Sequence, residues 1–191
     1  LSLTVAAAPP PPPAPPTSID ELVAFCQQRI VKLYGAGIGF SEGYGSGVLV
    51  SADGQIVTAD TTLLEGREIR AVLPDGRRLP AQVVKRDHRR QLALLQVDVT
   101  DAPHVPPASS DNLAPGDPVL AVSNVFKIAE GAEPPTAAIG AFAGRTAFDA
   151  RRRQTALAYD GDVLLTDVVT STPGAAGGGL FDLQGRLVGV I

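Results

Sequence analysis

Short apolar runs separated by tight-turn signals recur along most of this chain, and this pattern restricts the fold more than any other feature. The runs follow one another at roughly 8–12 residues, which is the spacing of strands in β-sandwiches and barrels. Turn pairs stand between several of them, namely Asp53-Gly54, Asp75-Gly76 and Gln184-Gly185. The 20 Gly and 17 Pro residues add further turns and interrupt helices. The pattern predicts an all-β fold of short antiparallel strands.

The expected strands form two sets on either side of a polar, proline-bearing stretch. Strands of the first set are expected from Ile30 onward and at Val48–Val50, Ile56–Val57, Ile69–Leu73, Ala81–Val84 and Leu92–Val97. Strands of the second set are expected at Val119–Val122, Ala137–Phe142, Leu157–Tyr159, Val163–Leu165, Leu180–Phe181 and Leu187–Val190. We therefore expect a first β-barrel at 29–100, an interbarrel linker at 101–118 and a second β-barrel at 119–191.

The residues before the first strand follow other patterns. Residues 1–8 resemble the end of a signal peptide, which indicates export; a cytosolic leader is the alternative, because no charged region precedes them. Residues 9–17 are rich in proline and predict an extended linker. Ser18 and Glu21 have the spacing of a capping box, which predicts a short N-terminal helix over residues 18–28.

Composition excludes several classes of function. The chain has 16 Lys+Arg against 20 Asp+Glu, whereas a nucleic-acid binder normally carries a basic surplus. Cys26 is the single cysteine, so an internal disulfide and a thiolate zinc cluster are excluded, and we expect it to be a small buried residue of the helix. No apolar run reaches the roughly 18 residues of a membrane span. We find no metal or phosphate-binding motif and expect no cofactor.

Several local motifs together carry a more specific signal, because they occur in a fixed order. They are GSGVLVSADG at 45–54, IVT at 56–58, LEG at 64–66, LPDGRRLPA at 73–81, the segments 84–95 and 115–121, and PGAAGGGLFDLQGRLVG at 173–189. In this order they resemble the trypsin-like domain of HtrA-type serine proteases, over about residues 30–191. The resemblance implies two six-stranded antiparallel β-barrels of trypsin-like topology. We expect the second barrel to be incomplete at its C-terminal end, because the sequence stops before the family's last strands.

The resemblance also assigns positions to a catalytic triad, in which a histidine base held by an aspartate activates a serine. The serine position falls on Ala176 and the aspartate position on Gln91. The histidine position falls on Thr61 when counted from the preceding strand, or on Thr62 when counted back from the LEG motif. All three catalytic residues are therefore replaced, which indicates a degenerate site, that is, a pseudoprotease.

Part of the family's site is retained by backbone groups. The resemblance places the oxyanion-binding N–H groups at Gly174 and Ala176, while substrate-binding residues remain unassigned.

Several other polar residues are candidates to replace the triad. They are His88, His104, Ser171, Thr172 and the Asp60-Thr61-Thr62 group, and the simplest interpretation of Asp60 is a strand-end Asx turn. We expect both histidines to face solvent, and the arginines at 151–153 to form a solvated hairpin tip.

These observations favour a catalytically inactive HtrA-like domain that binds a polypeptide or a protein partner. Its expected location is the cell envelope, either periplasmic or extracellular. One alternative is a serine-type endopeptidase with unconventional catalytic residues, and another is a structural interaction module with a closed cleft. Family members often assemble as trimers and often carry a PDZ domain, so a homo-oligomer is a further expectation, while the sequence does not decide whether a PDZ domain follows.

Overall fold

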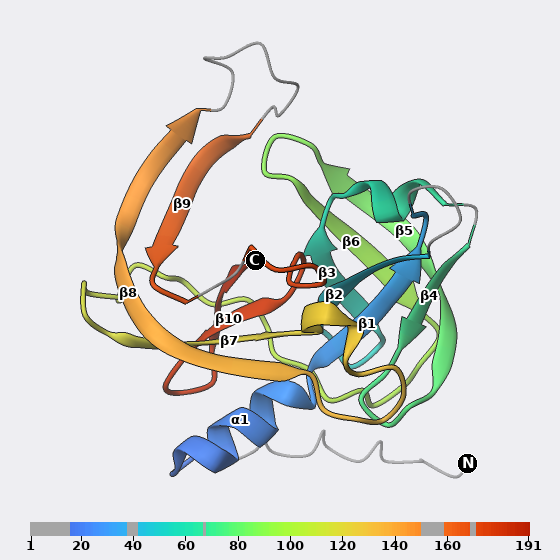
Figure 1. Ribbon diagram of the computed structural model, residues 1–191, viewed down its shortest axis with the longest axis horizontal. Coiled ribbons are helices and arrows are strands. Elements are labelled where there is room, and N and C mark those ends of the chain that lie inside the picture. The colour runs from blue at the N-terminus through green and yellow to red at the C-terminus, as the bar shows by residue number, and fades with distance from the viewer. Residues whose placement is uncertain (1–15, 38–41, 67, 150–158, 169–170) are drawn as a thin grey trace, which may run out of the picture.

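The computed structural model describes residues 16–37, 42–66, 68–149, 159–168 and 171–191. The expectations for residues 1–8, for the proline tract as far as residue 15 and for the arginines at 151–153 lie outside this part of the chain. No helix among the described residues is long and apolar enough to cross a membrane. Two β-structures lie side by side, and one α-helix packs beneath them (Figure 1).

The helix α1 spans Ile19–Gln27 and begins where the capping residues predict. The Ser18 hydroxyl accepts a hydrogen bond from Glu21 N at 3.2 Å, which satisfies one free N–H of the first turn. The Glu21 carboxylate reaches back one residue further than in a standard capping box, to the N and Oγ1 atoms of Thr17. The predicted helix is therefore confirmed, with a variant of the predicted cap.

The first β-structure is a closed barrel of six antiparallel strands, as expected. Its strands are β1 (Ile30–Gly35), β2 (Gly43–Leu49), β3 (Gln55–Ala59), β4 (Ile69–Val72), β5 (Arg78–Asp87) and β6 (Leu92–Val97). They join in the order β1-β2-β3-β6-β5-β4, and pairing of β1 with β4 closes the ring. A short 3₁₀ helix, η1 (Thr62–Glu65), follows β3.

Alternating burial along the strands builds the core of this barrel. In β6 the side chains of Ala93, Leu95 and Val97 are buried, while the residues between them are only partly covered. Ile56 of β3 and Ala71 of β4 join the same apolar cluster from neighbouring strands. Successive side chains of a strand point to opposite faces, so every second residue enters the barrel.

The second β-structure has fewer strands than the six expected. Among the described residues it contains five, β7 (Pro118–Ser123), β8 (Thr136–Asp149), β9 (Asp160–Thr166), β10 (Gly179–Asp182) and β11 (Leu187–Val190). Their order is β11-β10-β7-β8-β9, so β9 and β11 are the two ends of an open, curled sheet (Figure 1). The trypsin-like arrangement of two units is thereby confirmed, with the second unit open as a half-barrel. Of the strand expected at 157–159 only Tyr159 is described, and it precedes β9.

One apolar cluster contains side chains from α1 and from both β-structures, which pack against one another there. Leu22 and Cys26 of the helix pack with Val48 of the first barrel and with Leu120 and Phe181 of the half-barrel, and all five side chains are buried. The burial of Cys26 agrees with the sequence-based expectation.

The buried cysteine leads to a direct prediction about its reactivity. Burial raises the pKa of the Cys26 thiol to about 12, so almost no thiolate is present near pH 8. We expect Ellman's reagent to react with the native protein at least about 100-fold more slowly than with the unfolded chain in guanidinium chloride. Complete reaction within the mixing time in native buffer at pH 8 would contradict this placement of Cys26.

Candidate functional site

Backbone contacts bring together the three segments to which the sequence assigned the triad positions. Asp60 N, just before Thr61, donates a hydrogen bond to Gln91 O at 2.8 Å. Ser46 N on β2 donates to Ala176 O at 2.9 Å, which seats the loop before β10 against the first barrel. The triad positions thus lie on segments that meet where the barrel faces the half-barrel.

The loop that carries Ala176 is a chain of tight turns between Thr172 and Gly178. Ala175 N donates to Thr172 O at 3.1 Å, and Gly178 N donates to Ala175 O at 2.9 Å. Gly177 N donates to the carbonyl of Ile191 at 2.7 Å, which ties the loop to the end of β11. Ala176 is exposed on this loop, so the position assigned to a nucleophile presents only a methyl group.

Two positions of the loop require glycine. Gly174 has φ +87°, and a Cβ atom there would lie 2.1 Å from the carbonyl oxygen of Asn124. Gly177 has φ +83°, and its Cβ atom would lie 2.1 Å from both Ser46 O and Thr58 Oγ1. Positive φ angles and such close backbone approaches are both accessible to glycine alone at little cost.

The buried residue Ser46 connects the loop to both β-structures. Its hydroxyl donates to Gly174 O at 2.8 Å and accepts from Asn124 N, also at 2.8 Å. Its carbonyl accepts from the Thr58 hydroxyl at 2.6 Å, and its N–H holds Ala176 as described above. All the hydrogen-bonding groups of Ser46 therefore have partners, and its N–H and its hydroxyl bind the loop directly.

The loop retains two unused backbone donors. Gly174 N–H and Ala176 N–H make no hydrogen bond with the described part of the chain, whereas the intervening Ala175 N–H is bound to Thr172. These are the two N–H groups to which the sequence resemblance assigned the oxyanion. They remain free to donate hydrogen bonds to a carbonyl or carboxylate oxygen.

Thr61 and Thr62 both lie at the start of η1, and both are exposed. Thr61 occupies the N-cap position with extended backbone angles, and its side chain makes no capping hydrogen bond. Neither hydroxyl has a partner among the described residues, and neither carries a group that accepts a proton near neutral pH. These side chains cannot replace an imidazole base.

Gln91 lies in the turn between β5 and β6 with a left-handed backbone, at φ +51°. Such a conformation is uncommon for residues other than glycine, and asparagine and aspartate adopt it several-fold more often than glutamine does. The uncharged Gln91 amide cannot stabilise an imidazolium as a carboxylate would. The backbone geometry at Gln91 is therefore better suited to aspartate than to the residue present.

Sequence reasoning missed an ionic cluster beside this site. The Asp60 carboxylate is only 7% exposed and binds Arg86 Nη1 at 3.1 Å and His88 Nδ1 at 2.7 Å. Arg86 also contacts Glu65 at 2.5 Å and donates to Leu64 O at 2.8 Å. The expected Asx turn at Asp60 is wrong, because its carboxylate accepts no backbone hydrogen bond within the described residues.

The signal for this cluster was present in the spacing of Arg86 and His88. Residues i and i+2 near a strand end point to the same side, and β5 lies next but one to β3 in the barrel. His88 is 74% exposed, which agrees with the expectation of a solvent-facing ring. Its Nε2 atom is left without a partner in the described structure.

The remaining polar candidates do not assemble with the triad positions. His104 is held near α1, where its Nδ1 atom lies 3.0 Å from Ala102 O and its carbonyl accepts a hydrogen bond from Arg29. Ser171 is exposed, while Thr172 Oγ1 is buried and has no partner among the described residues. Those residues also contain no group of three or more His, Cys, Asp or Glu side chains arranged to hold a metal ion.

Comparison with known proteins gives a consistent match. Residues 45–190 match the family model described as trypsin-like peptidase domain. A Pseudomonas fulva protein named "Probable periplasmic serine endoprotease DegP-like" is 34% identical over 152 residues, which cover 78% of this chain and 29% of that protein. A protein of the same name from Chlamydia pneumoniae is 31% identical over 146 residues, covering 76% of this chain and 28% of its own length. The chain thus spans less than a third of these curated relatives.

Solved structures show the same relationship. The HtrA-type protease AlgW with tripeptide superposes with a TM-score of 0.75 at 29% identity, covering 91% of this chain and 53% of that chain. The serine endoprotease from Yersinia pestis superposes with a TM-score of 0.72 at 26% identity, covering 92% of this chain and 57% of that chain. Both superpositions include the barrel and the half-barrel of the present structure.

Proposed function

The chain belongs to the family of trypsin-like peptidase domains, and from this premise we propose that it is a catalytically inactive, HtrA-like member that binds polypeptide. One observation carries the proposal. The loop at the nucleophile position is held by tight turns, glycines and anchoring hydrogen bonds, yet its exposed residue is Ala176, which has no hydroxyl. The site has the framework of a peptidase without the reacting groups.

The other two triad positions support inactivity. At neutral pH neither a threonine at 61 or 62 nor Gln91 takes up or stabilises a proton. Triad residues act as a unit, so the loss of all three removes nearly all of the acceleration that the triad supplies, about 10⁶-fold in a serine protease. The remaining donors on Gly174 and Ala176 then serve binding rather than turnover.

Features around the loop support an extended polypeptide as the ligand. Two free N–H groups are available for a peptide carbonyl, and two large apolar side chains are exposed nearby, Phe126 at 60% and Ile128 at 64%. Phe126 belongs to the short η2 segment (Val125–Lys127), and its N–H donates to Pro173 O at 2.8 Å, directly beside Gly174. Apolar contacts next to backbone hydrogen bonds are the usual means of peptide recognition. The related AlgW structure is described as one with tripeptide.

The relatives also support a location for this activity. Two of them are named as periplasmic, and residues 1–8 resemble the end of a signal peptide. We therefore include export to the periplasm or the extracellular space in the proposal, with a protein or polypeptide partner and assembly into a homo-oligomer.

The proposal is tested by separating binding from hydrolysis. The purified chain is expected to bind fluorescein-labelled, reduced and carboxymethylated casein in an anisotropy titration, and to leave that casein intact over a day. It is also expected not to react with a fluorophosphonate probe, because labelling requires an activated hydroxyl. Active HtrA protease serves as the positive control. Cleavage of casein would overturn inactivity, and lack of casein binding would overturn the binding role.

A second candidate function is peptide hydrolysis with a displaced base. The observation that favours it is the pair of Asp60 and His88 at 2.7 Å, since a carboxylate-held imidazole is the usual general base of serine peptidases. This candidate predicts cleavage that is lost in both His88→Ala and Asp60→Asn, with Arg90→Ala as the matched control from the same turn.

A further inference from the structure

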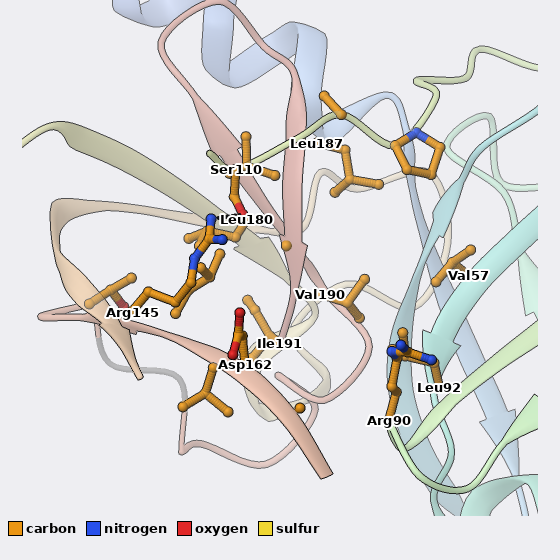
Figure 2. A pocket seen from close by; sticks show the side chains of 18 of the residues that line it. Val57, Arg90, Leu92, Ser110, Arg145, Asp162, Leu180, Leu187, Val190 and Ile191 are labelled. Carbon is orange, nitrogen blue, oxygen red and sulfur yellow. Dashed lines mark hydrogen bonds between the residues drawn. The ribbon is translucent and has the colours of Figure 1, made fainter. Parts of the chain in front are cut away.

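The connector between β7 and β8, residues 124–135, lies against the first barrel. It contains η2 and runs beside β1 (Figure 1). It is separate from the cavity of about 1080 Å³ beside β9 and β11, which Figure 2 shows and which no connector residue lines. Phe126 and Ile128, the exposed apolar side chains of the proposed peptide site, both belong to the connector. The contacts that hold the connector therefore decide where these two side chains stand.

The backbone of the connector is strained at η2. Phe126 and Lys127 both have left-handed backbones, at φ +54° and +57°. Two such residues in succession are uncommon without glycine, and each costs free energy. The hydrogen bonds within this turn are long, at 3.3 Å both from Lys127 N to Asn124 O and from Ile128 N to Val125 O. Contacts from outside η2 are therefore needed to hold this conformation.

Lys32 and Tyr34 of β1 supply such contacts. Their neighbours along the strand point into the core of the barrel, so Lys32 and Tyr34 point outward, toward the connector. Lys32 Nζ donates to Gly131 O at 2.7 Å, and the Tyr34 hydroxyl donates to Ala129 O at 3.2 Å. Both side chains are buried. Alternate positions of β1 thus bind alternate carbonyls of the connector.

The buried side chain of Asn124 extends these contacts to η2. Its Nδ2 atom donates to Ala129 O at 3.0 Å, and its Oδ1 atom accepts from Ala129 N at 3.1 Å. The Ala129 carbonyl therefore binds both Tyr34 and Asn124. The stretch that carries Phe126 and Ile128 is thereby closed at both ends and attached to β1.

Lys32 is an unusual residue for such a position. Its side chain is fully buried, and no carboxylate of the described residues forms an ion pair with its ammonium group. Burial lowers the pKa of Lys32, and the Glu133 carboxylate opposes this effect. A buried ammonium group without an ionic partner costs folding free energy, which an apolar methionine side chain does not. Stability alone therefore does not explain a lysine here, whereas its hydrogen bond to the connector does.

We propose that Lys32 is a positioning residue for the proposed peptide site: by binding the connector at Gly131, it holds the conformation that exposes the two apolar side chains. The proposal rests on the proposed function, because Phe126 and Ile128 are there assigned to contact the peptide. Tyr34 acts in the same way at a second carbonyl of the connector. A surface that is ordered before binding loses less conformational entropy when the peptide binds, which raises the affinity.

Lys32→Met separates positioning from stability. This variant is expected to weaken the binding of labelled casein about threefold to tenfold, because the connector is no longer ordered beforehand. Its midpoint of urea denaturation is expected to stay the same or to rise, because a buried charge is removed. Lys85 on β5 is exposed, and Lys85→Met is the control for the loss of one positive charge, with unchanged casein binding expected. Unchanged casein binding by Lys32→Met, or weaker binding together with a lower urea midpoint, would overturn the positioning role.

A fluorophore on the connector reports its order without any peptide. The chain contains no tryptophan, so Phe126→Trp introduces a single indole, at a side chain that is already exposed. Adding Lys32→Met is expected to lower the fluorescence anisotropy of this indole, because the connector becomes more mobile, while adding Lys85→Met leaves the anisotropy unchanged. Equal anisotropy in the two double variants would show that Lys32 does not order the connector.

The two measurements keep this proposal distinct from the proposed function. If the unmodified chain binds no casein, the proposed function fails, and the anisotropy of Phe126→Trp still decides whether Lys32 orders the connector. If the unmodified chain binds casein and Lys32→Met binds it equally well, only the positioning role fails.

Discussion

The triple variant Thr61→His, Gln91→Asp, Ala176→Ser is expected to cleave casein about tenfold to a hundredfold above the unmodified chain, and to label with fluorophosphonate. The gain is a small fraction of the roughly 10⁶-fold contribution of a mature triad, because the surrounding site is not optimised for turnover. The measurement is the release of fluorescein-labelled peptides from casein, with labelling of the serine as the second readout.

Three structural features support this gain. The two donors at Gly174 and Ala176 are unused, the loop that would carry the serine is anchored by Ser46, and the left-handed backbone at Gln91 suits aspartate. The hydrogen bond from Asp60 N to Gln91 O keeps the positions of the base and its orienting group adjacent. The backbone of the site is thus in place for the three side chains.

Two control variants isolate the cause of any activity. Ala176→Ser alone is expected to stay inactive, because a serine without a base keeps its proton. A triple variant with Thr62→His in place of Thr61→His decides between the two histidine positions that the sequence left open. If both triple variants fold and neither labels, the assignment of these positions to the triad is wrong.

The second large effect concerns stability. Gly177→Ala is expected to lower the free energy of unfolding by about 3 kcal/mol or more, because the new methyl group meets Ser46 O and Thr58 Oγ1 at 2.1 Å and φ is +83°. The measurement is urea denaturation followed by circular dichroism.

Gly116→Ala is the matched control for backbone strain. Gly116 has φ +97°, but nothing lies within 4 Å of an added Cβ atom, so this variant is expected to lose only about 1–2 kcal/mol. Equal losses of unfolding free energy in the two alanine variants would show that the positive φ angle, and not the close contacts of the new methyl group, causes the destabilisation. The contact of the loop with the first barrel would then contribute little to stability.

Local sequence signals were sufficient to predict most of the fold. The alternation in Leu92–Val97 and the cap at Ser18 each placed an element to within a residue, since both depend on neighbours in the chain. The length of β8, which extends to Asp149, was underestimated because its second half is largely exposed and lacks an apolar pattern. The open, five-stranded form that the second unit takes among the described residues was expected only through the family resemblance.

The part of the site formed by a single loop motif could be predicted from the sequence. The part formed by side chains that meet only in the folded barrel could not. The loop was identified by the resemblance of residues 173–180 to the family's serine motif. The structure gives the physical reason for two glycines of that motif, because Gly174 and Gly177 combine a positive φ with close backbone approach. The contacts of Asp60 with Arg86 and His88 join residues 26 and 28 positions apart, through strand neighbours that only the barrel order defines. The spacing of Arg86 and His88 places both side chains on one side of the chain, but it does not show that this side faces Asp60.

The role of Ser46 has an evolutionary consequence. The buried hydroxyl and carbonyl of Ser46 bind Gly174, Asn124 and Thr58. The loop that carries Ala176 therefore also helps to hold the barrel and the half-barrel together. Purifying selection for a folded protein would then preserve the loop's glycines independently of any selection for proteolysis. The exposed side chain at position 176 does not contribute to these contacts, so substitutions at that position would not be selected against for stability. Folding alone is therefore a sufficient reason to keep the glycines around Ala176, and a peptidase-like loop is not in itself evidence of proteolysis.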